Sequence, residues 1–239
     1  MSPVLLPPMP PSLRIKLLGG FAVHSSDRLI SLPHQAERVL ALLALSHRQQ
    51  RREGLIGRLW PEFSQDRAQA CLRSALWRVR RVQPALLEVS SNVIRIPSWV
   101  AIDLDEATEL ARPRANPPAV ATANAVLFAE DLLPEWDDEW VVFERERVRQ
   151  LRIHALEGLS LALANAGRYA EAIEAACIAV AAEPLRDSAH AALISAHLAE
   201  GNRGEAVRAF QRYAELMKAE LGVPPAARVS ALLRAVMSA

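Results

Sequence analysis

DRAQACLRSALWRVRRV, residues 66–82, has the 3.6-residue period of an amphipathic helix with two chemically different faces. Asp66 is its only acidic residue and suits the N-cap position. One face is apolar and consists of Ala68, Leu72, Ala75, Leu76 and Val79. The opposite face combines cations with small residues and one aromatic side chain: Arg67, Ala70, Arg73, Ser74, Trp77, Arg78 and Arg81, with Arg80 at its flank. The stretch therefore predicts a helix that packs on a core through one face and presents positive charge on the other.

A cationic helix face has two interpretations. It can be plain solvated surface, but solvated helices usually mix Glu with Arg so that ion pairs form four residues apart, and residues 66–82 contain no Glu. A helix that docks in a nucleic-acid groove needs this composition, because arginine binds phosphates and guanine edges and small residues permit close approach. The composition favours nucleic-acid binding.

The segments before this helix predict a small sheet and two further helices. Alternating apolar residues over 13–18, with short apolar runs at 21–23 and 29–32, are typical of a small antiparallel sheet. Gln35–Ser46 has apolar residues at helical spacing, and Arg52–Trp60 fits a shorter helix that ends before Pro61. Three helices in this order are typical of a helix-turn-helix unit.

A hairpin follows the third helix. Leu86–Val89 and Val93–Ile96 are rich in apolar residues and are separated by the turn residues Ser90, Ser91 and Asn92. Three helices followed by a hairpin make a winged helix-turn-helix, whose third helix enters the major groove. Arg95 is the one cation on the hairpin; it can contact phosphate or the minor groove, or bury its alkyl stem in the core. Arg80 has a comparable structural alternative, an ion pair at the edge of the core.

Charge is distributed unevenly along the chain. Residues 13–100 contain 14 Lys and Arg against 6 Asp and Glu, whereas residues 101–239 contain 14 against 21. A net charge of +8 in the first half suggests a polyanionic partner, and nucleic acid is the commonest one. The acidic half would repel a phosphate backbone, so we expect it to face a different partner.

The second half predicts helical repeats. Residues 111–119 contain three prolines and are expected to form a linker or an exposed turn. The sequence GRYAEA at 167–172 returns as GNRGEA at 201–206, an offset of 34 residues, which is the period of tetratricopeptide repeats. Before them lies one long predicted helix over 138–166, with these candidate core residues: Trp140, Val141, Leu151, Leu156, Leu159 and Leu163.

Other functional classes lack support in the sequence. His190 and His197 lie seven residues apart, but no Cys or acid completes a set of metal ligands. We find no phosphate loop, nucleophile motif or carboxylate pair, and therefore expect no enzyme activity, no cofactor and no metal. No apolar run reaches the ~20 residues of a membrane span, and residues 1–12 read as a flexible leader rather than a signal peptide. A cytoplasmic protein without membrane partners is expected.

The chain resembles the Streptomyces antibiotic regulatory protein family of transcriptional activators. In the first half, the resemblance rests on LRIKLLGGFAV (13–23), Gln35–Leu45, LIGRLWPE (55–62), ALWRVRRV (75–82), VIRI (93–96) and IDLDEA (102–107). In the second half, it rests on Leu132-Leu133-Pro134, Trp140, AGRYAEAI (166–173), AAEPLRD (181–187) and AELGVPPAARVSALLRAV (219–236). Two departures stand out, because Val93–Ile96 replaces a family Gly-Tyr-Arg-Leu segment and Trp77 occupies a position that is usually polar.

The resemblance implies a mainly α-helical chain with two domains. Its parts would be a leader (1–12), a winged helix-turn-helix domain (13–110), a linker or exposed turn (111–119) and an all-α bacterial transcriptional activation domain of tetratricopeptide-like repeats (120–239). It also implies an activator that binds direct repeats in double-stranded promoter DNA as a homodimer and recruits RNA polymerase.

Within this interpretation, the basic side chains fall into two groups. We expect base-edge contacts from Arg73, Ser74, Trp77 and Arg78, and phosphate contacts from Arg67, Arg80, Arg81 and Arg95. The alternative is a repeat-type adaptor that binds a protein partner, with a basic domain of non-specific nucleic-acid affinity. A hydrolase or metalloenzyme is a third class, which would need a ligand pocket or a metal site.

Overall fold

The computed structural model describes residues 12–110 and 130–237. The predicted linker at 111–119 and almost all of the predicted leader lie outside these described residues. The described residues form two compact units. Unit 1 contains residues 12–105 and 133–144, and unit 2 contains residues 106–110, 130–132 and 145–237.

Unit 1 opens with a small mixed sheet. Its strands are β1 (Leu13–Lys16), β2 (Ala22–Ser25), β3 (Arg28–Ile30) and β7 (Ala101–Ile102), in the order β3-β2-β1-β7. The predicted antiparallel pairing of the first three strands is confirmed. β7 pairs in parallel with β1 and was not predicted, because a strand of two residues carries no detectable period.

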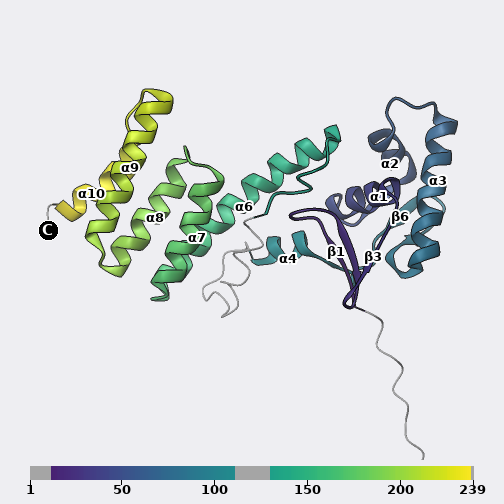
Figure 1. Ribbon diagram of the computed structural model, residues 1–239, viewed down its shortest axis with the longest axis horizontal. Coiled ribbons are helices and arrows are strands. Elements are labelled where there is room, and N and C mark those ends of the chain that lie inside the picture. The colour runs from purple at the N-terminus through teal and green to yellow at the C-terminus, as the bar shows by residue number, and fades with distance from the viewer. Residues whose placement is uncertain (1–11, 111–129, 238–239) are drawn as a thin grey trace, which may run out of the picture. The chain divides into compact units, whose positions relative to one another are not determined.

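Three helices cover the core of unit 1 (Figure 1). They are α1 (His34–Leu45), α2 (Arg52–Leu59) and α3 (Gln65–Val82). The buried residues of α3 are the five that its sequence period predicts for the apolar face. The predicted N-cap at Asp66 is wrong: α3 begins one residue earlier, Ser64 is its N-cap, and Asp66 lies in the first turn.

A second sheet forms the wing. The predicted hairpin is present as β5 (Glu88–Val89) and β6 (Val93–Arg95), which follow a short 3-10 turn at Pro84–Leu86. A third strand, β4 (Gln49–Arg51), pairs with β6 and places the start of α2 beside the hairpin. β4 was missed, because its sequence Gln-Gln-Arg is polar throughout.

Asp103 joins the two ends of unit 1. It is the first residue of α4 (Asp103–Leu110) and is 1% exposed. Its carboxylate accepts backbone hydrogen bonds from Leu17, Leu18 and Leu104 at 2.8–3.0 Å. Burial raises the pKa of Asp103, and the three N–H donors oppose that effect. The carboxylate thereby satisfies the backbone at the end of β1.

Asp103→Asn is expected to lower the free energy of unfolding by about 1–3 kcal/mol. Both carboxylate oxygens accept N–H groups, so the amide NH2 of Asn must face a backbone donor. Urea denaturation followed by circular dichroism measures the loss. Asp105→Asn is the control, since the Asp105 side chain is 45% exposed; equal stability of Asp103→Asn and the wild type would contradict the assigned role.

Residues 133–144 pack with unit 1. The Leu133 N–H donates to the carbonyl oxygen of Leu17 at 2.9 Å. The ring of Trp136 lies 5.7 Å from that of Phe21. These contacts bring a segment from late in the sequence against β1 and the turn that follows it.

Unit 2 contains stacked helices. They are the C-terminal part of α6 (Glu139–Asn165), α7 (Tyr169–Ala182), α8 (Asp187–Glu200), α9 (Arg203–Leu221) and α10 (Ala227–Met237). Consecutive helices from α7 to α10 contact each other and lie side by side (Figure 1). Gly167 and Gly201, 34 residues apart, have φ of 75° and 86° in the turns before α7 and α9, a conformation that favours glycine. The predicted tetratricopeptide-like architecture is confirmed.

Small residues are buried where these helices cross. Ala172, Ala176 and Ala179 of α7 and Ala206 of α9 are 0% exposed, which lets helix axes approach closely. Leu151 was predicted to be in the core, but this is wrong because the side chain is 44% exposed. Its position on α6 faces solvent, whereas its neighbours in the same turn are buried.

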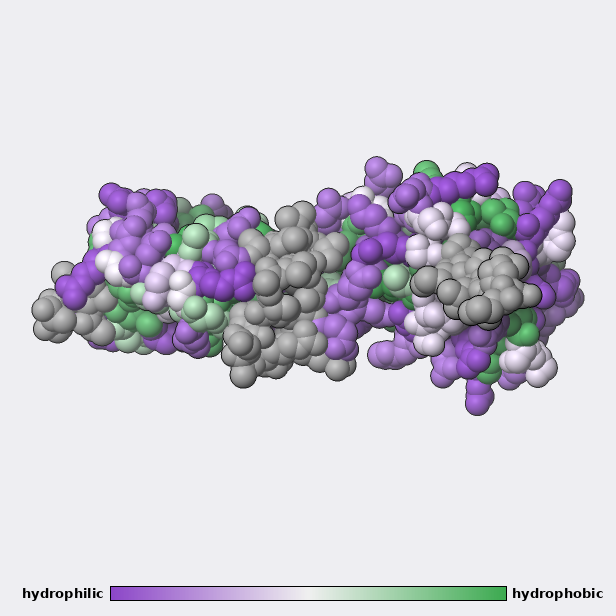
Figure 2. All heavy atoms as spheres, turned by 90° about the horizontal axis from the view of Figure 1, so that it is seen from below, coloured by the Kyte–Doolittle hydropathy of each residue, from purple (hydrophilic) through white to green (hydrophobic). Residues whose placement is uncertain are grey.

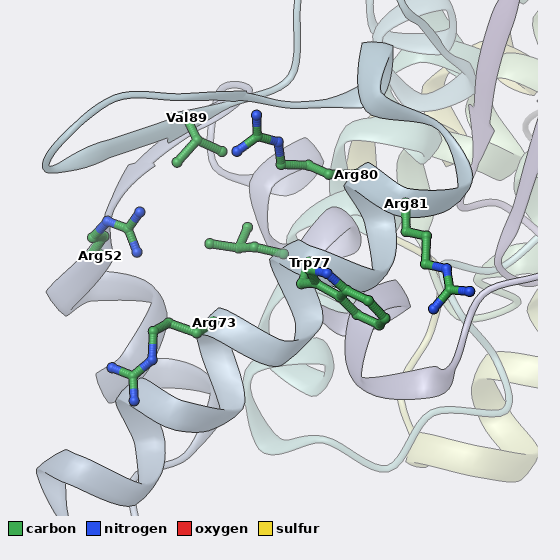
Figure 3. A pocket seen from close by; sticks show the side chains of 7 residues that line it. Arg52, Arg73, Trp77, Arg80, Arg81 and Val89 are labelled. Atoms are coloured by element: carbon green, nitrogen blue, oxygen red, sulfur yellow. The ribbon is translucent and has the colours of Figure 1, made fainter.

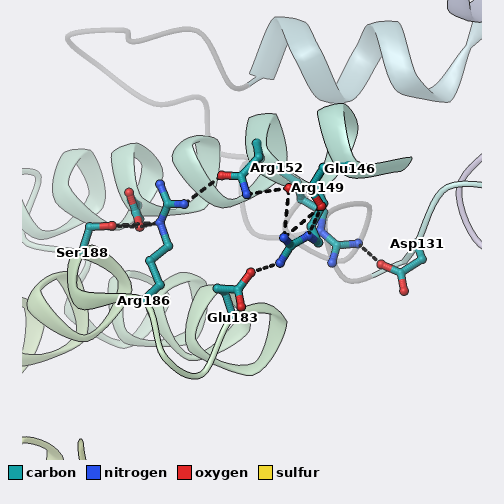
Figure 4. Close-up of polar contacts among 9 residues, drawn as sticks. Asp131, Glu146, Arg149, Arg152, Glu183, Arg186 and Ser188 are labelled. Atoms are coloured by element: carbon teal, nitrogen blue, oxygen red, sulfur yellow. Dashed lines mark hydrogen bonds and ion pairs between the residues drawn. The ribbon is translucent and has the colours of Figure 1, made fainter. Parts of the chain in front are cut away.

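An ion-pair and hydrogen-bond network joins α6 to the turn between α7 and α8 (Figure 4). Arg186 donates to Glu157 and to Gln150, each at 2.9 Å. Arg149 of α6 pairs with Glu183 at the end of α7. These contacts fix the register of α6 against the first predicted repeat.

The surface carries hydrophobic residues in small, separate areas among hydrophilic ones on the face shown in Figure 2. None of the helices in the described ranges combines the length and the apolar character that a bilayer crossing requires.

Candidate nucleic-acid interface

Every predicted contact residue is exposed in the structure. Seven of the eight lie on α3, and Arg95 lies on β6 of the wing. Between the first and last of the seven, α3 carries no acidic residue. The helix buries its apolar face against α1 and α2, and this packing turns the cationic face outward.

A hollow of about 480 Å³ lies between α3 and the wing (Figure 3). It is lined by Arg52, Arg73, Leu76, Trp77, Arg80, Arg81 and Val89. The structure thus brings four of the predicted residues together in one place: Arg73, Trp77, Arg80 and Arg81. Arg67, Ser74, Arg78 and Arg95 lie outside its lining.

Arg52 completes the hollow and was missed by the sequence reasoning. It is the first residue of α2, and Figure 3 shows it across the hollow from α3. Its backbone N–H donates to the Asn92 carbonyl at 3.0 Å, and its Nε donates to the Ser91 carbonyl at 3.1 Å. The turn of the wing therefore orients this arginine. The only sequence signal is the Arg51-Arg52 pair itself.

A second hollow of about 450 Å³ continues the same surface toward the start of α3. It shares Arg52 and Arg73 with the first and adds the amide side chains of Gln65, Gln69 and Asn92. Amides can donate to and accept from base edges as well as phosphates.

Arg95 has an intramolecular partner. Its Nε donates to Glu88 Oε2 at 2.6 Å, across the β5–β6 pair, and the two side chains also form an ion pair. The Arg95 side chain is 58% exposed, so the alternative of a buried alkyl stem does not hold. Arg80 forms no ion pair with any residue in the described ranges. The predicted alternative for Arg80, an ion pair at the edge of the core, is therefore not observed.

Aromatic rings lie beside three of the arginines. The guanidinium carbon of Arg67 lies 4.2 Å from the centre of the Phe63 ring. Those of Arg81 and Arg78 lie 5.0 Å and 6.0 Å from the centre of the Trp77 ring. Such contacts hold a cation in place without neutralising its charge.

His190 of unit 2 serves packing. His190 is 6% exposed, and its ring stacks on Tyr213 at 3.9 Å between centroids. Within the described ranges, His, Cys, Asp and Glu side chains form no group of three that could hold a metal ion.

Comparisons with known proteins agree with this architecture. The family model described as bacterial transcriptional activator domain matches residues 102–237, more than half of the chain. Regulatory protein AfsR of Streptomyces coelicolor is 28% identical over 245 residues, with 95% of this chain and 24% of the relative covered. Regulatory protein AfsR of Streptomyces griseus is 27% identical over 248 residues, with 98% and 25% covered. The chain spans about a quarter of the length of these relatives.

One solved structure shares the fold. Mycobacterium tuberculosis EmbR, in complex with a low affinity phosphopeptide, superposes with a TM-score of 0.70 at 19% identity, covering 95% of this chain and 65% of that one. At this identity the likeness concerns the fold: a winged helix followed by tetratricopeptide-like helices. The matching family model shows that the chain belongs to the bacterial transcriptional activator domain family.

Proposed function

We propose that this chain is a sequence-specific, DNA-binding transcriptional activator that acts in the cytoplasm. The observation that carries the proposal is the exposed cationic face of α3 beside the basic hollow under the wing. An α-helix fits the major groove of B-DNA, which is about 12 Å wide. The 18 residues of α3 span about 27 Å at 1.5 Å per residue, enough to cross the groove and reach both phosphate walls.

The proposed roles of the side chains are supported by their positions. Arg73, Ser74, Trp77 and Arg78 are assigned to base edges, because they lie in the middle of α3, between Arg67 near its start and Arg80 and Arg81 in its last turn. Arg67, Arg80, Arg81 and Arg95 are assigned to phosphates, which position the protein without reading sequence. We add Arg52 to the residues assigned to phosphates, because the wing turn holds its side chain opposite α3.

Glu88→Gln is expected to strengthen non-specific DNA binding by roughly threefold at low salt and to steepen the salt dependence by about one phosphate contact. The substitution removes the ion pair that occupies Arg95. Fluorescence anisotropy with a duplex of unrelated sequence, titrated at several salt concentrations, measures both. Asp27→Asn gives the same change in net charge away from the wing. An equal response of the two variants would mean that net charge alone is responsible.

We further propose that the protein binds direct repeats as a dimer and that unit 2 recruits RNA polymerase. Stacked helical repeats present extended surfaces suited to protein partners, and residues 101–239 carry the net negative charge that keeps them away from the phosphate backbone. Run-off transcription from a bound promoter, with purified bacterial RNA polymerase, tests recruitment. Unchanged transcript yield on adding the protein would contradict it.

The first test of DNA binding is selection of genomic fragments with the purified chain at about 0.15 M salt, followed by sequencing. Enrichment of a few fragments that share a pair of direct repeats is the expected result. Uniform recovery of all fragments would mean binding through charge alone, and would favour the alternative of a repeat-type adaptor with non-specific nucleic-acid affinity.

A further inference from the structure

Trp77 is an exposed aromatic residue near the middle of the cationic face of α3. The residue is 54% exposed. At about 100° per residue, it lies about 40° from Arg73 on one side and about 40° from Arg81 on the other. It also lines the hollow between α3 and the wing. A large apolar ring therefore occupies the part of the helix that would come closest to a bound duplex.

The indole of Trp77 differs from those of two other tryptophans in unit 1. Trp60 is 5% exposed, and its Nε1 donates to Gln35 at 3.1 Å. Trp140 is 7% exposed, and its Nε1 donates to Asp138 at 3.2 Å. Trp77 Nε1 has no hydrogen-bond partner among the described residues. Packing within unit 1 thus accounts for the other two rings but not for Trp77.

The surroundings of the ring determine what can cover it. The guanidinium carbons of Arg81 and Arg78 lie 5.0 Å and 6.0 Å from the centre of the Trp77 ring. Arg73 lies one helical turn away. These positive charges would repel a cationic protein surface. Against a membrane-inserted segment, the arginines would have no anionic partner. A DNA major groove offers phosphates to the arginines and, at each thymine, one apolar group, the 5-methyl.

Resting on the proposed function, we propose that Trp77 is a specificity-determining residue that reads thymine through its 5-methyl group. The flanking arginines restrict the ring, because cation–π contacts hold both partners in place. Thymine differs from cytosine in the major groove by its methyl and its O4 acceptor, and the carbon edge of the indole matches the methyl. The contact selects T at one or two positions of each half-site.

The test uses the full chain and the direct-repeat duplex recovered by genomic selection, with each thymine replaced singly by deoxyuridine. This replacement removes one methyl group and leaves Watson–Crick pairing intact. For the wild type, affinity is expected to fall about fourfold at one or two positions per half-site, the value of one buried methyl. Trp77→Ala is expected to bind the thymine and deoxyuridine duplexes equally at those positions, with overall affinity reduced.

Trp99→Ala is the matched control, because Trp99 is 49% exposed in the same unit but lies outside α3. It is expected to keep the wild-type response to deoxyuridine, and the circular dichroism of both variants checks that they fold. A wild-type protein indifferent to deoxyuridine, or a Trp77→Ala variant that retains the response, overturns the inference. A Trp77 ring that wedges between base pairs would also overturn the inference. In that case, Trp77→Ala would weaken binding to the thymine and deoxyuridine duplexes alike, and the difference in affinity between them would remain.

The failure of the proposed function has a different signature. If selection enriches no sequence, DNA reading by this chain fails as a whole, and the role of Trp77 fails with it. If an operator is recovered and its affinity does not depend on any thymine methyl, the activator proposal stands and only the role of Trp77 is rejected.

Discussion

Arg73→Ala combined with Arg78→Ala is expected to lower affinity for the selected operator by about 100-fold or more, while folding is unchanged. An arginine that binds a guanine edge through two hydrogen bonds contributes about 1–3 kcal/mol of discrimination. The free energies of two such contacts add, so their effects on affinity multiply. The two residues lie at opposite edges of the exposed face of α3, about 140° apart. Both side chains are exposed, so neither substitution leaves a cavity in the core.

The measurement is anisotropy with the operator and with a scrambled duplex at the same salt. The double variant should bind the two with nearly equal affinity, because its remaining cations still attract phosphate. Arg28→Ala with Arg203→Ala removes the same charge from exposed positions outside α3 and should retain the preference for the operator. Retention of that preference by the α3 double variant would reject α3 as the recognition helix.

Long periodic segments were predictable from the sequence, whereas short pairings were not. The apolar face of α3 was predicted residue by residue, since 18 residues provide five turns over which the period is unambiguous. The 34-residue repeat was likewise visible, because glycine is needed at both positive-φ turns. β4 and β7, with three and two residues, have no period of their own and form only because neighbouring strands offer hydrogen-bond partners.

The candidate site was predictable in composition but not in geometry. The sequence places the arginines on one face, but it does not place Arg52 opposite them, because that contact depends on β4 pairing with β6. Nor does it pair Arg95 with Glu88, seven residues away, since the pairing depends on the register of the hairpin. Leu151 was misplaced because α6 is apolar at many positions and its hydrophobic period does not single out the buried face.

Tyr213→Ala is expected to lower the free energy of unfolding of unit 2 by about 4 kcal/mol. Tyr213 of α9 is 0% exposed and stacks on His190 of α8. Its hydroxyl donates to Asp187, whose Oδ1 also accepts the N–H of Ala226 just before α10. The side chain thus links three helices, and truncation leaves both a cavity and a carboxylate without its hydroxyl partner.

Two further variants separate these contributions. Tyr213→Phe keeps the ring and is expected to cost about 1–2 kcal/mol, whereas Tyr169→Ala removes a partly buried tyrosine of α7 and should cost less than Tyr213→Ala. Urea denaturation is followed by circular dichroism at about pH 7.5, because burial lowers the pKa of His190 from 6.5. The contribution of neutral His190 to stability is complete above the ordinary histidine pKa of 6.5 and is lost as pH falls through the lowered pKa of the folded protein. Similar costs for Tyr213→Ala and Tyr213→Phe would mean that the hydroxyl, and not the packed ring, holds the repeats together.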